Sequence, residues 1–374
     1  MMRKKITFYC DSMDSGGTEK ATLDLVNNLS KEKYEITVVQ LAPGGKYHKQ
    51  LHRNIKCKEI IHVSPKKAFR LYWWARKIYN KIPIAINHKL FIGDKQDVEI
   101  ACGYGYPTQI VAKSKKAKKI SWIHMDVSLD RNYVSNLSRE EGEEYFEGID
   151  EFVCVSNDCA IKFNEKFGYE EKTKVCYNIV PADNIIRQSK ENIDIKFQTE
   201  NFNIISIGRL TWQKGFDNLI NAIQSIIKEN SKIHLYIVGE GEDRKLLQNL
   251  MKDLDVADNI HLLGHVDNPY PLLKNADLYV CSSRHESFSL TVAESLILET
   301  PVISTRCTGP IELLENGKYG LLVDNNVSAL RDGIADILEN KEKLADLKSM
   351  ACKRKEFFDI KKSIKKWETI LDEK

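Results

Sequence analysis

Two glutamates in the last third of the chain have a spacing that suits two separate carboxylate contacts. Glu286 and Glu294 lie eight residues apart in the run SRHESFSLTVAE, residues 283–294. Eight residues of continuous helix span about 12 Å at a rise of about 1.5 Å per residue, whereas the carboxyl pairs of glycoside hydrolases lie roughly 5–9 Å apart. We therefore expect separate tasks, one at a sugar hydroxyl and one at a nucleoside ribose. The alternative is that both are ordinary surface residues.

A pair of cations further upstream would suit a diphosphate. Arg209 and Lys214 lie five residues apart in GRLTWQKGF, residues 208–216, where a strand is expected to end and a helix to begin. The guanidinium fork of arginine and the point charge of lysine both bind phosphate oxygens. Two solvated surface cations are the alternative interpretation of this spacing.

Glycine turns at two expected helix starts could bring backbone N–H groups to an anion. Gly16 and Gly17 precede a helix near the amino terminus, and Gly239 begins the turn GEG before another. Free N–H groups and the helix dipole favour a negative ligand at such a start, although the acidic residues after Gly239 would repel a pyrophosphate. Neither turn matches the dinucleotide or Walker fingerprint, so a plain tight turn is the alternative for each.

These residues need elements that bring them to the edge of a sheet. Short β-rich runs alternate with amphipathic helical stretches twice along the chain, which is typical of parallel sheets covered by helices. The first series places strands at residues 5–10, 35–41, 98–102, 119–124, 152–156 and 174–180 and a helix at 17–30. The second places strands at 203–210, 233–239, 260–263, 278–282 and 302–305 and helices at 216–228, 242–254 and 290–298. The predicted fold class is α/β, with two doubly wound halves and any ligand between them at the carboxyl ends of the strands.

Length and composition agree with two domains. The chain has 374 residues, of which 42% are hydrophobic and 29% charged, and a domain usually has about 100–200 residues. A polar, charged segment at residues 181–201 separates the two series, so we expect domains at 1–185 and 186–355. A helix over the remaining residues, 356–374, would be placed to cross back over the first domain.

Taken together, the motifs resemble those of a family 4 glycosyltransferase. In order along the chain they are Gly16-Gly17-x-Glu19, Gly208-Arg209-x4-Lys214-Gly215, Gly239-x-Gly241, Gly264-His265-Val266, Glu286-x7-Glu294 and Thr300-Pro301-Val302-Ile303. That family is retaining, uses nucleotide sugars and has the GT-B fold, in which two Rossmann-like domains face each other across a cleft. The departures are Ser287, where the family often has glycine, and the hinge run Asn178-Ile179-Val180-Pro181 in place of Asn-Gly-Val-Asp.

The resemblance implies a role for each motif residue. Glu286 would contact the donor sugar and Glu294 the ribose hydroxyls. Arg209 and Lys214 would hold the diphosphate and stabilise it as a leaving group. The positions implied to line the donor site or flank the nucleotide are Gly16, Gly17, Gly239, Val266, Phe288, Ser289 and Leu290.

The resemblance also implies an electrostatic mechanism and a catalytic histidine. His124, in the run SWIHMD, is similar to the family's histidine at a strand end near the sugar and the acceptor; a structural role is the alternative. Breaking the anomeric bond leaves negative charge on the nucleotide diphosphate, which Arg209, Lys214 and the helix starts would receive. No metal and no other cofactor is expected, since the spacing Asp11-Ser-Met-Asp14 is not an Asp-x-Asp motif. Retention without an evident nucleophile suggests front-face attack.

Formal charge is distributed unevenly along the chain. Residues 1–120 hold 24 Lys/Arg and 10 Asp/Glu, and the rest hold 32 and 43, so the net charge of +3 combines a basic first third with an acidic remainder. On a helical wheel, residues 66–81 place four cations on one face, beside Trp73 and Trp74, with Leu71, Ala75, Ile78 and Tyr79 opposite. The four cations are Lys66, Arg70, Lys77 and Lys81. Such a stripe suits an anionic membrane surface; a solvated cationic face is the alternative.

The expected partners follow from these features. The donor would be a nucleotide sugar, with a UDP-sugar favoured, and the acceptor a polyprenyl-diphosphate-linked sugar or a polysaccharide in cell-surface glycan synthesis. No apolar run is long enough for a bilayer span or a signal peptide, so we expect a cytoplasmic protein, peripheral on the inner face of the cell membrane. No nucleic-acid recognition module is apparent.

Two other function classes are alternatives for this sequence. A nicotinamide-dependent oxidoreductase fits the alternation of strands and helices, but the first strand lacks Gly-x-Gly-x-x-Gly after it. A non-catalytic membrane-binding or sugar-binding relative would require loss of Glu286, Glu294, Arg209 or Lys214, and all four are present. The nine cysteines have no zinc-like spacing, and we expect them to be buried, reduced thiols.

Overall fold

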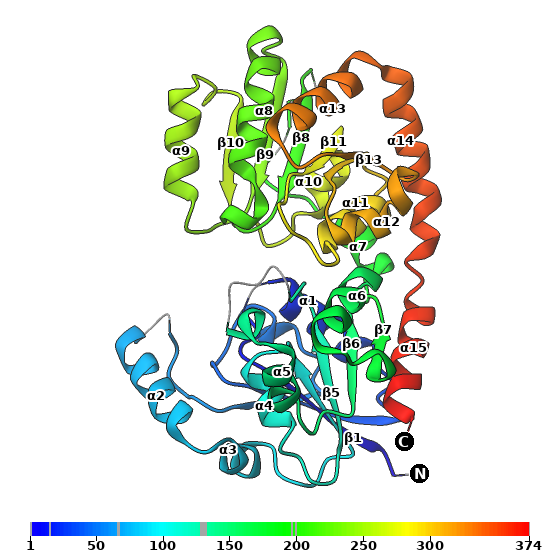
Figure 1. The fold of residues 1–374 in the computed structure, drawn as a ribbon. Coiled ribbons are helices and arrows are strands. Elements are labelled where there is room, and N and C mark those ends of the chain that lie inside the picture. The colour runs from blue at the N-terminus through cyan, green and yellow to red at the C-terminus, as the bar shows by residue number, and fades with distance from the viewer. Residues whose placement is uncertain are drawn as a thin grey trace. The chain divides into compact units, whose positions relative to one another are not determined.

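The computed structural model describes residues 2–14, 16–65, 68–127, 133–195, 197–198 and 200–373. The chain divides into two compact units, the first ending at Ile179 and the second running from Val180 to Ile360, after which Lys361 and the residues that follow return to the first unit. Figure 1 colours the chain from blue to red in this order. The sequence placed the division at 185/186 and the start of the last segment at 356, so the structure sets both boundaries a few residues away.

The first unit is built on a parallel sheet. Its described residues form seven strands in the order β3-β2-β1-β4-β5-β6-β7. The strands are β1 (Lys4–Cys10), β2 (Tyr34–Gln40), β3 (Lys56–Glu59), β4 (Val98–Cys102), β5 (Lys118–Ile123), β6 (Glu151–Cys154) and β7 (Thr173–Val175). All five residues of β4 are buried, as expected for a central strand of a sheet covered on both faces. The sequence analysis missed β3, an edge strand with the sequence KCKE.

Helices connect these strands, as a doubly wound fold requires. In the described residues they are α1 (Gly17–Asn28), η1 (His48–Gln50), α2 (Phe69–Lys81), α3 (Ile84–Phe91), α4 (Tyr106–Val111), η2 (Tyr133–Asn136), α5 (Arg139–Tyr145), α6 (Asn157–Phe167) and η3 (Glu170–Lys172). Ser138 caps α5 in a capping box with Glu141, and Ser156 caps α6, so two helix starts are fixed by local hydrogen bonds. One side of the core is an aromatic cluster that includes Phe146, Phe152 and Phe163.

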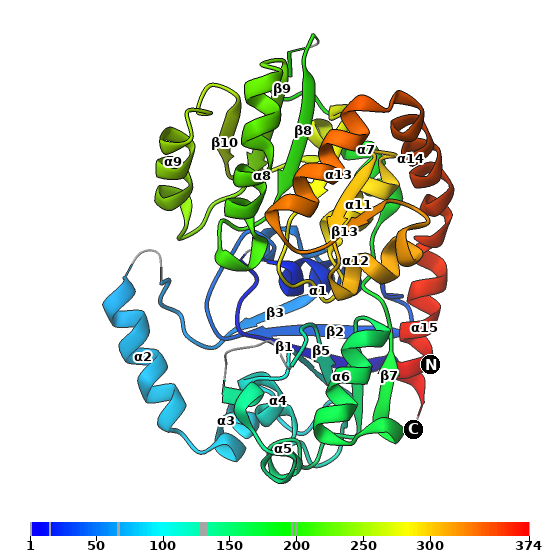
Figure 2. The same cartoon turned by 45° about the horizontal axis from the view of Figure 1, so that its top comes forward.

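The last helix of the chain packs on the first unit. The side of α15 (Ile360–Asp372) that carries Trp367, Ile370 and Leu371 is buried. Lys118 donates to the carbonyl oxygen of Ile370 at 2.8 Å, and Tyr34 donates to Asp372 at 3.0 Å. Figures 1 and 2 both show α15, in red, beside the strands of this unit.

The second unit repeats the design with a six-stranded parallel sheet in its described residues. Its strand order is β10-β9-β8-β11-β12-β13. The strands are β8 (Phe202–Ile207), β9 (Ile233–Val238), β10 (Ile260–Gly264), β11 (Leu278–Cys281), β12 (Val302–Thr305) and β13 (Leu321–Val323). The direction of winding reverses between β8 and β11, and ligands of such sheets bind at the carboxyl ends of the strands beside that reversal.

The helices of the second unit cover both faces of its sheet. They are α7 (Ala182–Gln188), η4 (Trp212–Lys214), α8 (Phe216–Glu229), α9 (Arg244–Asp253), α10 (Tyr270–Asn275), α11 (Leu290–Ile297), α12 (Thr308–Leu313), η5 (Glu315–Gly317), α13 (Val327–Glu339), α14 (Lys341–Arg354) and η6 (Lys355–Phe357). Leu219, Ile220 and Ile223 form part of the buried face of α8. They pack with strand residues such as Ile204 and Leu235 in one cluster, which fixes the helix start at Phe216 relative to the end of β8.

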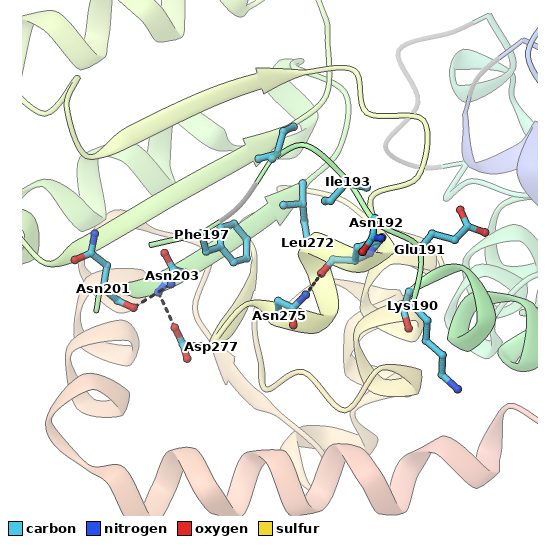
Figure 3. Close-up of a pocket in the computed structure, with 13 residues that line it drawn as sticks. Lys190, Glu191, Asn192, Ile193, Phe197, Asn201, Asn203, Leu272, Asn275 and Asp277 are labelled. Carbon is cyan, nitrogen blue, oxygen red and sulfur yellow. Dashed lines mark hydrogen bonds between the residues drawn. The ribbon is translucent and has the colours of Figure 1, made fainter. Parts of the chain in front are cut away.

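The second unit contains a cavity of about 560 Å³ between the segment after α7 and helix α10. Figure 3 shows its lining, in which the backbone N–H of Asn203 donates to Asp277 at 2.8 Å. Its lining residues include none of the positions that the sequence predicts for catalysis or donor binding. Because those positions follow the carboxyl ends of strands, we treat the strand edge, not this cavity, as the candidate site.

Candidate active site

Two loops of the second unit meet where its sheet reverses direction. The loop after β8 carries Lys214, the loop after β11 carries Glu286, and these two side chains form an ion pair. Ser283 also donates to Glu286 at 3.0 Å. Only 19% of the Lys214 side chain and 11% of the Glu286 side chain are exposed. Burial alone would lower the pKa of Lys214, but the charge of Glu286, together with its hydrogen bond to Lys214 and the neighbouring Cys281, outweighs burial and raises the pKa, so the ammonium remains charged at neutral pH.

Arg284 ties these two loops together. Its guanidinium donates to both carboxylate oxygens of Asp217, at 2.9 and 2.8 Å, and to the carbonyl oxygen of Trp212 at 2.6 Å. The guanidinium also lies over the Trp212 ring, 4.9 Å from its centroid. Burial would raise the pKa of Asp217, but the hydrogen bonds and charge of Arg284 outweigh it and lower the pKa. The sequence analysis assigned no role to Arg284 or Asp217, although Arg284 lies two residues before Glu286.

Arg209 lies on the same loop as Lys214 but is exposed. Among the described residues no ion pair of Arg209 is found. Its positive charge is near enough to Lys214 to oppose the rise in the lysine pKa. The end of β8 therefore presents one cation that is paired with Glu286 and another that faces solvent.

The second glutamate lies inside α11 and has a different hydrogen-bond partner from the first. Glu294 is buried and accepts a hydrogen bond from the Tyr270 hydroxyl at 2.9 Å. Ser289, the residue before the helix, has a left-handed backbone with φ of 66°. This turn directs the chain into α11 at Leu290. The side chain of Phe288, the residue before Ser289, is buried. The two carboxylates thus have different hydrogen-bond partners, and Tyr270 is a contact that the sequence analysis missed.

Glycines are required where the ends of β8, β9 and β10 approach one another. Gly239 has φ of 146°, and a Cβ atom there would lie 1.8 Å from the carbonyl oxygen of Gly208. A Cβ atom on Gly241 would lie 2.2 Å from the carbonyl oxygen of Leu210. The N–H of Gly239 donates to the carbonyl oxygen of Gly264 at 2.8 Å, two residues before Val266. Close backbone packing therefore requires a glycine at position 239. This structural reason exists in addition to the nucleotide contact that the resemblance implies.

The first unit holds the remaining predicted positions of the active site. His124 follows β5, and its ring centroid lies 4.3 Å from that of Trp122. Burial lowers the pKa of His124 to about 3, so the imidazole is neutral at pH 7. Gly16, with φ of 153°, precedes α1, and Gly17 is its first residue. The carboxylate of Glu19 lies where a side chain on Gly16 would extend, so an anion at this helix start would meet a negative charge.

The predicted cationic helix is present as α2, but its buried face differs from the one expected. Lys66 lies outside the described residues. Arg70, Lys77, Lys81, Trp73 and Trp74 are all exposed. Of the side chains placed opposite the cations, Tyr79 is buried, but Leu71 and Ile78 are 50% and 44% exposed. Tyr72, which the wheel did not place there, is also buried, and the Tyr79 hydroxyl hydrogen-bonds that of Tyr9 at 2.6 Å.

Other expectations concern cysteines, metals and membrane spans. Seven cysteines are buried and free, whereas Cys57 and Cys352 are exposed. Within the described ranges, no cluster of three or more histidine, cysteine, aspartate or glutamate side chains could hold a metal ion. None of the described helices is long and apolar enough to cross a bilayer.

Residues 188–354, which contain every candidate of the second unit, match the family model Glycosyl transferases group 1. The chain is 27% identical to the lipopolysaccharide core biosynthesis glycosyltransferase LpsE of Rhizobium meliloti, over 86% of this chain and 84% of that one. An uncharacterized glycosyltransferase of Haemophilus influenzae is 25% identical over 98% of this chain and 100% of its own length. The chain is a glycosyltransferase.

Further relatives agree with this assignment. An uncharacterized glycosyltransferase of Methanocaldococcus jannaschii is 33% identical, but the match spans 54% of this chain and 58% of that relative. The crystal structure of Anabaena HepE in complex with UDP has a TM-score of 0.75 at 19% identity, covering 98% of this chain and 99% of that one. WaaG, a glycosyltransferase involved in lipopolysaccharide biosynthesis, has a TM-score of 0.70 at 14% identity, covering 99% and 100%. The fold of this glycosyltransferase is thus GT-B, and the oxidoreductase alternative is wrong.

Proposed function

We propose that this glycosyltransferase moves a hexose or N-acetylhexosamine from a UDP-sugar to a lipid-linked or polysaccharide acceptor in cell-surface glycan synthesis, with retention of anomeric configuration. The observation that carries the proposal is the ion pair of Lys214 and Glu286 at the reversal point of the second sheet. The names of similar proteins support the donor and the acceptor. They include HepE bound to UDP-glucose, a Staphylococcus aureus poly(ribitol-phosphate) N-acetylglucosaminyltransferase and a Campylobacter jejuni transferase acting on a diphospho-undecaprenol-linked sugar.

The proposed mechanism stabilises the departing diphosphate by fixed charges. As the anomeric bond breaks, negative charge grows on the phosphate, and Arg209 and Lys214 are the cations at the end of β8 that can receive it. The first free N–H groups of α11, at Leu290, add further donors. Because these groups belong to loops that are already hydrogen-bonded in place, little reorganisation is needed at the moment of reaction.

The carboxylates and the histidine take the remaining roles. Glu286 would accept a hydrogen bond from a hydroxyl of the donor sugar, and Glu294 would accept one from the ribose. A neutral His124 can donate or accept one hydrogen bond at the sugar without adding charge. The proton of the acceptor hydroxyl would pass to the leaving phosphate in a front-face attack. We propose that no metal takes part, since the two cations supply the positive charge that a metal would otherwise provide.

Product analysis with a panel of donors tests this proposal. Purified protein is incubated with a synthetic polyprenyl-diphosphate sugar and UDP-glucose, UDP-galactose, UDP-N-acetylglucosamine, UDP-N-acetylgalactosamine, GDP-mannose or ADP-glucose, with and without EDTA. We expect transfer from a UDP-sugar, an α-linked product by NMR from these α-linked donors, and no loss with EDTA. Transfer from only GDP-mannose or ADP-glucose would refute the donor, a β-linked product would refute retention, and inhibition by EDTA restored by Mg²⁺ would refute metal independence.

We further propose that α2 docks the first unit on an anionic membrane, which would bring the protein to a lipid-linked acceptor. Exposed cations of α2 alternate with exposed apolar side chains, of which Phe69 is 65% and Trp74 is 62% exposed. Figures 1 and 2 both show α2 projecting from the sheet of its unit. No acidic residue occurs between Glu59 and Asp94. The helix therefore combines positive charge with interfacial aromatic residues, the composition of a membrane-surface helix.

Flotation with vesicles tests the docking of α2. We expect the protein to float with vesicles of phosphatidylcholine and phosphatidylglycerol, and the triple variant Arg70→Glu, Lys77→Glu, Lys81→Glu to bind about 100-fold more weakly, at about 1 kcal/mol or more for each charge. The matched control reverses three exposed lysines of the second unit, Lys228, Lys245 and Lys252. Equal binding by the α2 variant and the parent protein would overturn the proposal, as would an equal loss in the control.

A further inference from the structure

Three neighbouring aromatic rings connect the last helix of the chain to His124. The His124 ring lies 4.3 Å from that of Trp122, and the Trp122 ring lies 4.7 Å from that of Trp367, at an interplanar angle of 70°. We infer that Trp367 is a positioning residue for His124 and that it acts through Trp122. The inference rests on the role proposed above for His124. It gives α15 a part in the reaction, although that helix contributes no residue to the predicted site.

Packing is what fixes the orientation of the His124 ring. No hydrogen bond to this imidazole is found among the residues that the structure describes, and its Nε2 atom is buried without a partner there. Most catalytic histidines are oriented by a hydrogen bond to one ring nitrogen. Here the ring contact found for the imidazole is the Trp122 indole, at an interplanar angle of 46°. The direction in which His124 presents its nitrogen therefore depends on where Trp122 lies.

Trp122 in turn depends on Trp367. Both indoles are fully buried, and the Nε1 atom of each lacks a hydrogen-bond partner in the described part of the chain. Neither indole is therefore anchored by its polar atom. An edge-to-face arrangement of two aromatic rings is worth about 0.5–1.5 kcal/mol beyond the area it buries, and it defines the orientation of both rings. A smaller side chain at position 367 would leave space into which Trp122 can turn.

Several contacts in the second half of α15 hold the helix on the first unit, so the effect of Trp367 on the rings can be separated from the docking of the helix. Lys118 and Tyr34 hydrogen-bond the last turn of α15, and Lys33 pairs with Glu368 at 2.6 Å. Leu371 is as deeply buried as Trp367 but has no aromatic ring. A substitution of Leu371 therefore weakens the packing of α15 and leaves the rings in place, which makes it the matched control.

The experiment compares Trp367→Leu with Leu371→Ala in the full-length protein. Transfer is measured as UDP released from the UDP-sugars of the panel, together with the melting temperature. Both variants are expected to lower the melting temperature by several degrees, because each leaves a cavity. Only Trp367→Leu is expected to lower kcat, by about ten- to a hundred-fold, with less than about a twofold change in the KM for the donor. Trp367→Phe, which restores a ring, is expected to recover most of kcat.

The Hε1 resonance of His124 provides a readout that does not depend on activity. We expect it to move in Trp367→Leu, because the ring current of Trp122 shifts with its orientation, and to stay in place in Leu371→Ala. An equal loss of kcat in the two variants, or an unmoved resonance in Trp367→Leu, would overturn the inference. His124→Ala is measured beside them. If the His124→Ala variant keeps the parent kcat, the role proposed for His124 is wrong, and so is the positioning role of Trp367. The donor and product assignments would be unaffected, because the product analysis with the donor panel tests them separately.

Discussion

Lys214→Met is expected to lower kcat for sugar transfer by about 10²–10³-fold, the usual cost of removing one group that stabilises charge in a transition state. Two effects combine in this variant. In the proposed mechanism the leaving phosphate loses a partly buried cation, and Glu286 is left as an uncompensated carboxylate with only 11% of its side chain exposed. Breaking a buried ion pair by removing one partner destabilises a protein by about 3–5 kcal/mol; with this pair partly exposed, we expect less.

The double variant separates the two effects. Adding Glu286→Gln to Lys214→Met removes the unpaired carboxylate, so stability is expected to recover while kcat remains low. Kinetics and thermal unfolding of the two single variants and the double variant measure both quantities. The control is Lys318→Met, since Lys318 pairs with Glu315 in the same unit but is 59% exposed, and exposed pairs contribute little. If Lys214→Met retained parent kcat, the electrostatic mechanism would be wrong.

Arg284→Lys is expected to weaken UDP binding and kcat/KM by about tenfold each, although the charge is kept. Lysine cannot reproduce the fork that donates to both carboxylate oxygens of Asp217 while also reaching the backbone of Trp212. Without that fork, the loop that carries Lys214 is held less firmly against the loop that carries Glu286, although the Lys214–Glu286 ion pair and the hydrogen bond from the Arg284 N–H to the Gln213 carbonyl oxygen remain. Calorimetric titration with UDP and steady-state kinetics measure the two losses.

A double-mutant cycle with Asp217→Asn tests whether the fork is the cause. Residues in direct contact usually show coupling energies of about 0.5–3 kcal/mol, so the second substitution should cost far less once the first is present. Arg331→Lys, at an exposed pair with Asp332 on α13, is the control and should leave UDP binding unchanged. Fully additive losses would show that Arg284 and Asp217 act independently.

Because the pKa of Asp217 is lowered in the folded state, the stability that the pair contributes is present above about pH 4 and lost as the pH falls through that lowered pKa.

Much of this fold is predictable because strong local patterns determine it. The central strands are mostly apolar and must be buried on both faces, and each candidate loop follows one of them, so Lys214 and Glu286 could be assigned to strand ends from the sequence. Strand β3 could not be predicted, because an edge strand with the sequence KCKE has no apolar pattern. The buried face of α2 was only partly predictable, for a different reason. Helical periodicity places Leu71, Ile78 and Tyr79 opposite the cations, but only Tyr79 is buried, where its hydroxyl hydrogen-bonds that of Tyr9.

Contacts between residues distant in sequence account for what was missed at the site. Arg284 meets Asp217 across 67 positions, and Trp367 meets Trp122 from the other end of the chain. Neither pair has a spacing that a periodic pattern can reveal. Such contacts become visible only when the order of strands is known, since that order decides which loops are neighbours. Position relative to the sheet was therefore predictable, and the partners that orient the side chains were not.

The return of the chain to its first unit also constrains the order in which the protein can be assembled during synthesis. Proteins are made from the amino terminus, and domains generally fold in that order. Here the sheet of the first unit is made early, but Trp367, which packs on Trp122, and the other buried residues of α15 are made last. The second unit lies wholly between them and can complete its own core first. The first unit to emerge from the ribosome is thus the last to become fully native, and a nascent chain stalled before residue 367 would leave the Trp122 side of that sheet without its cover.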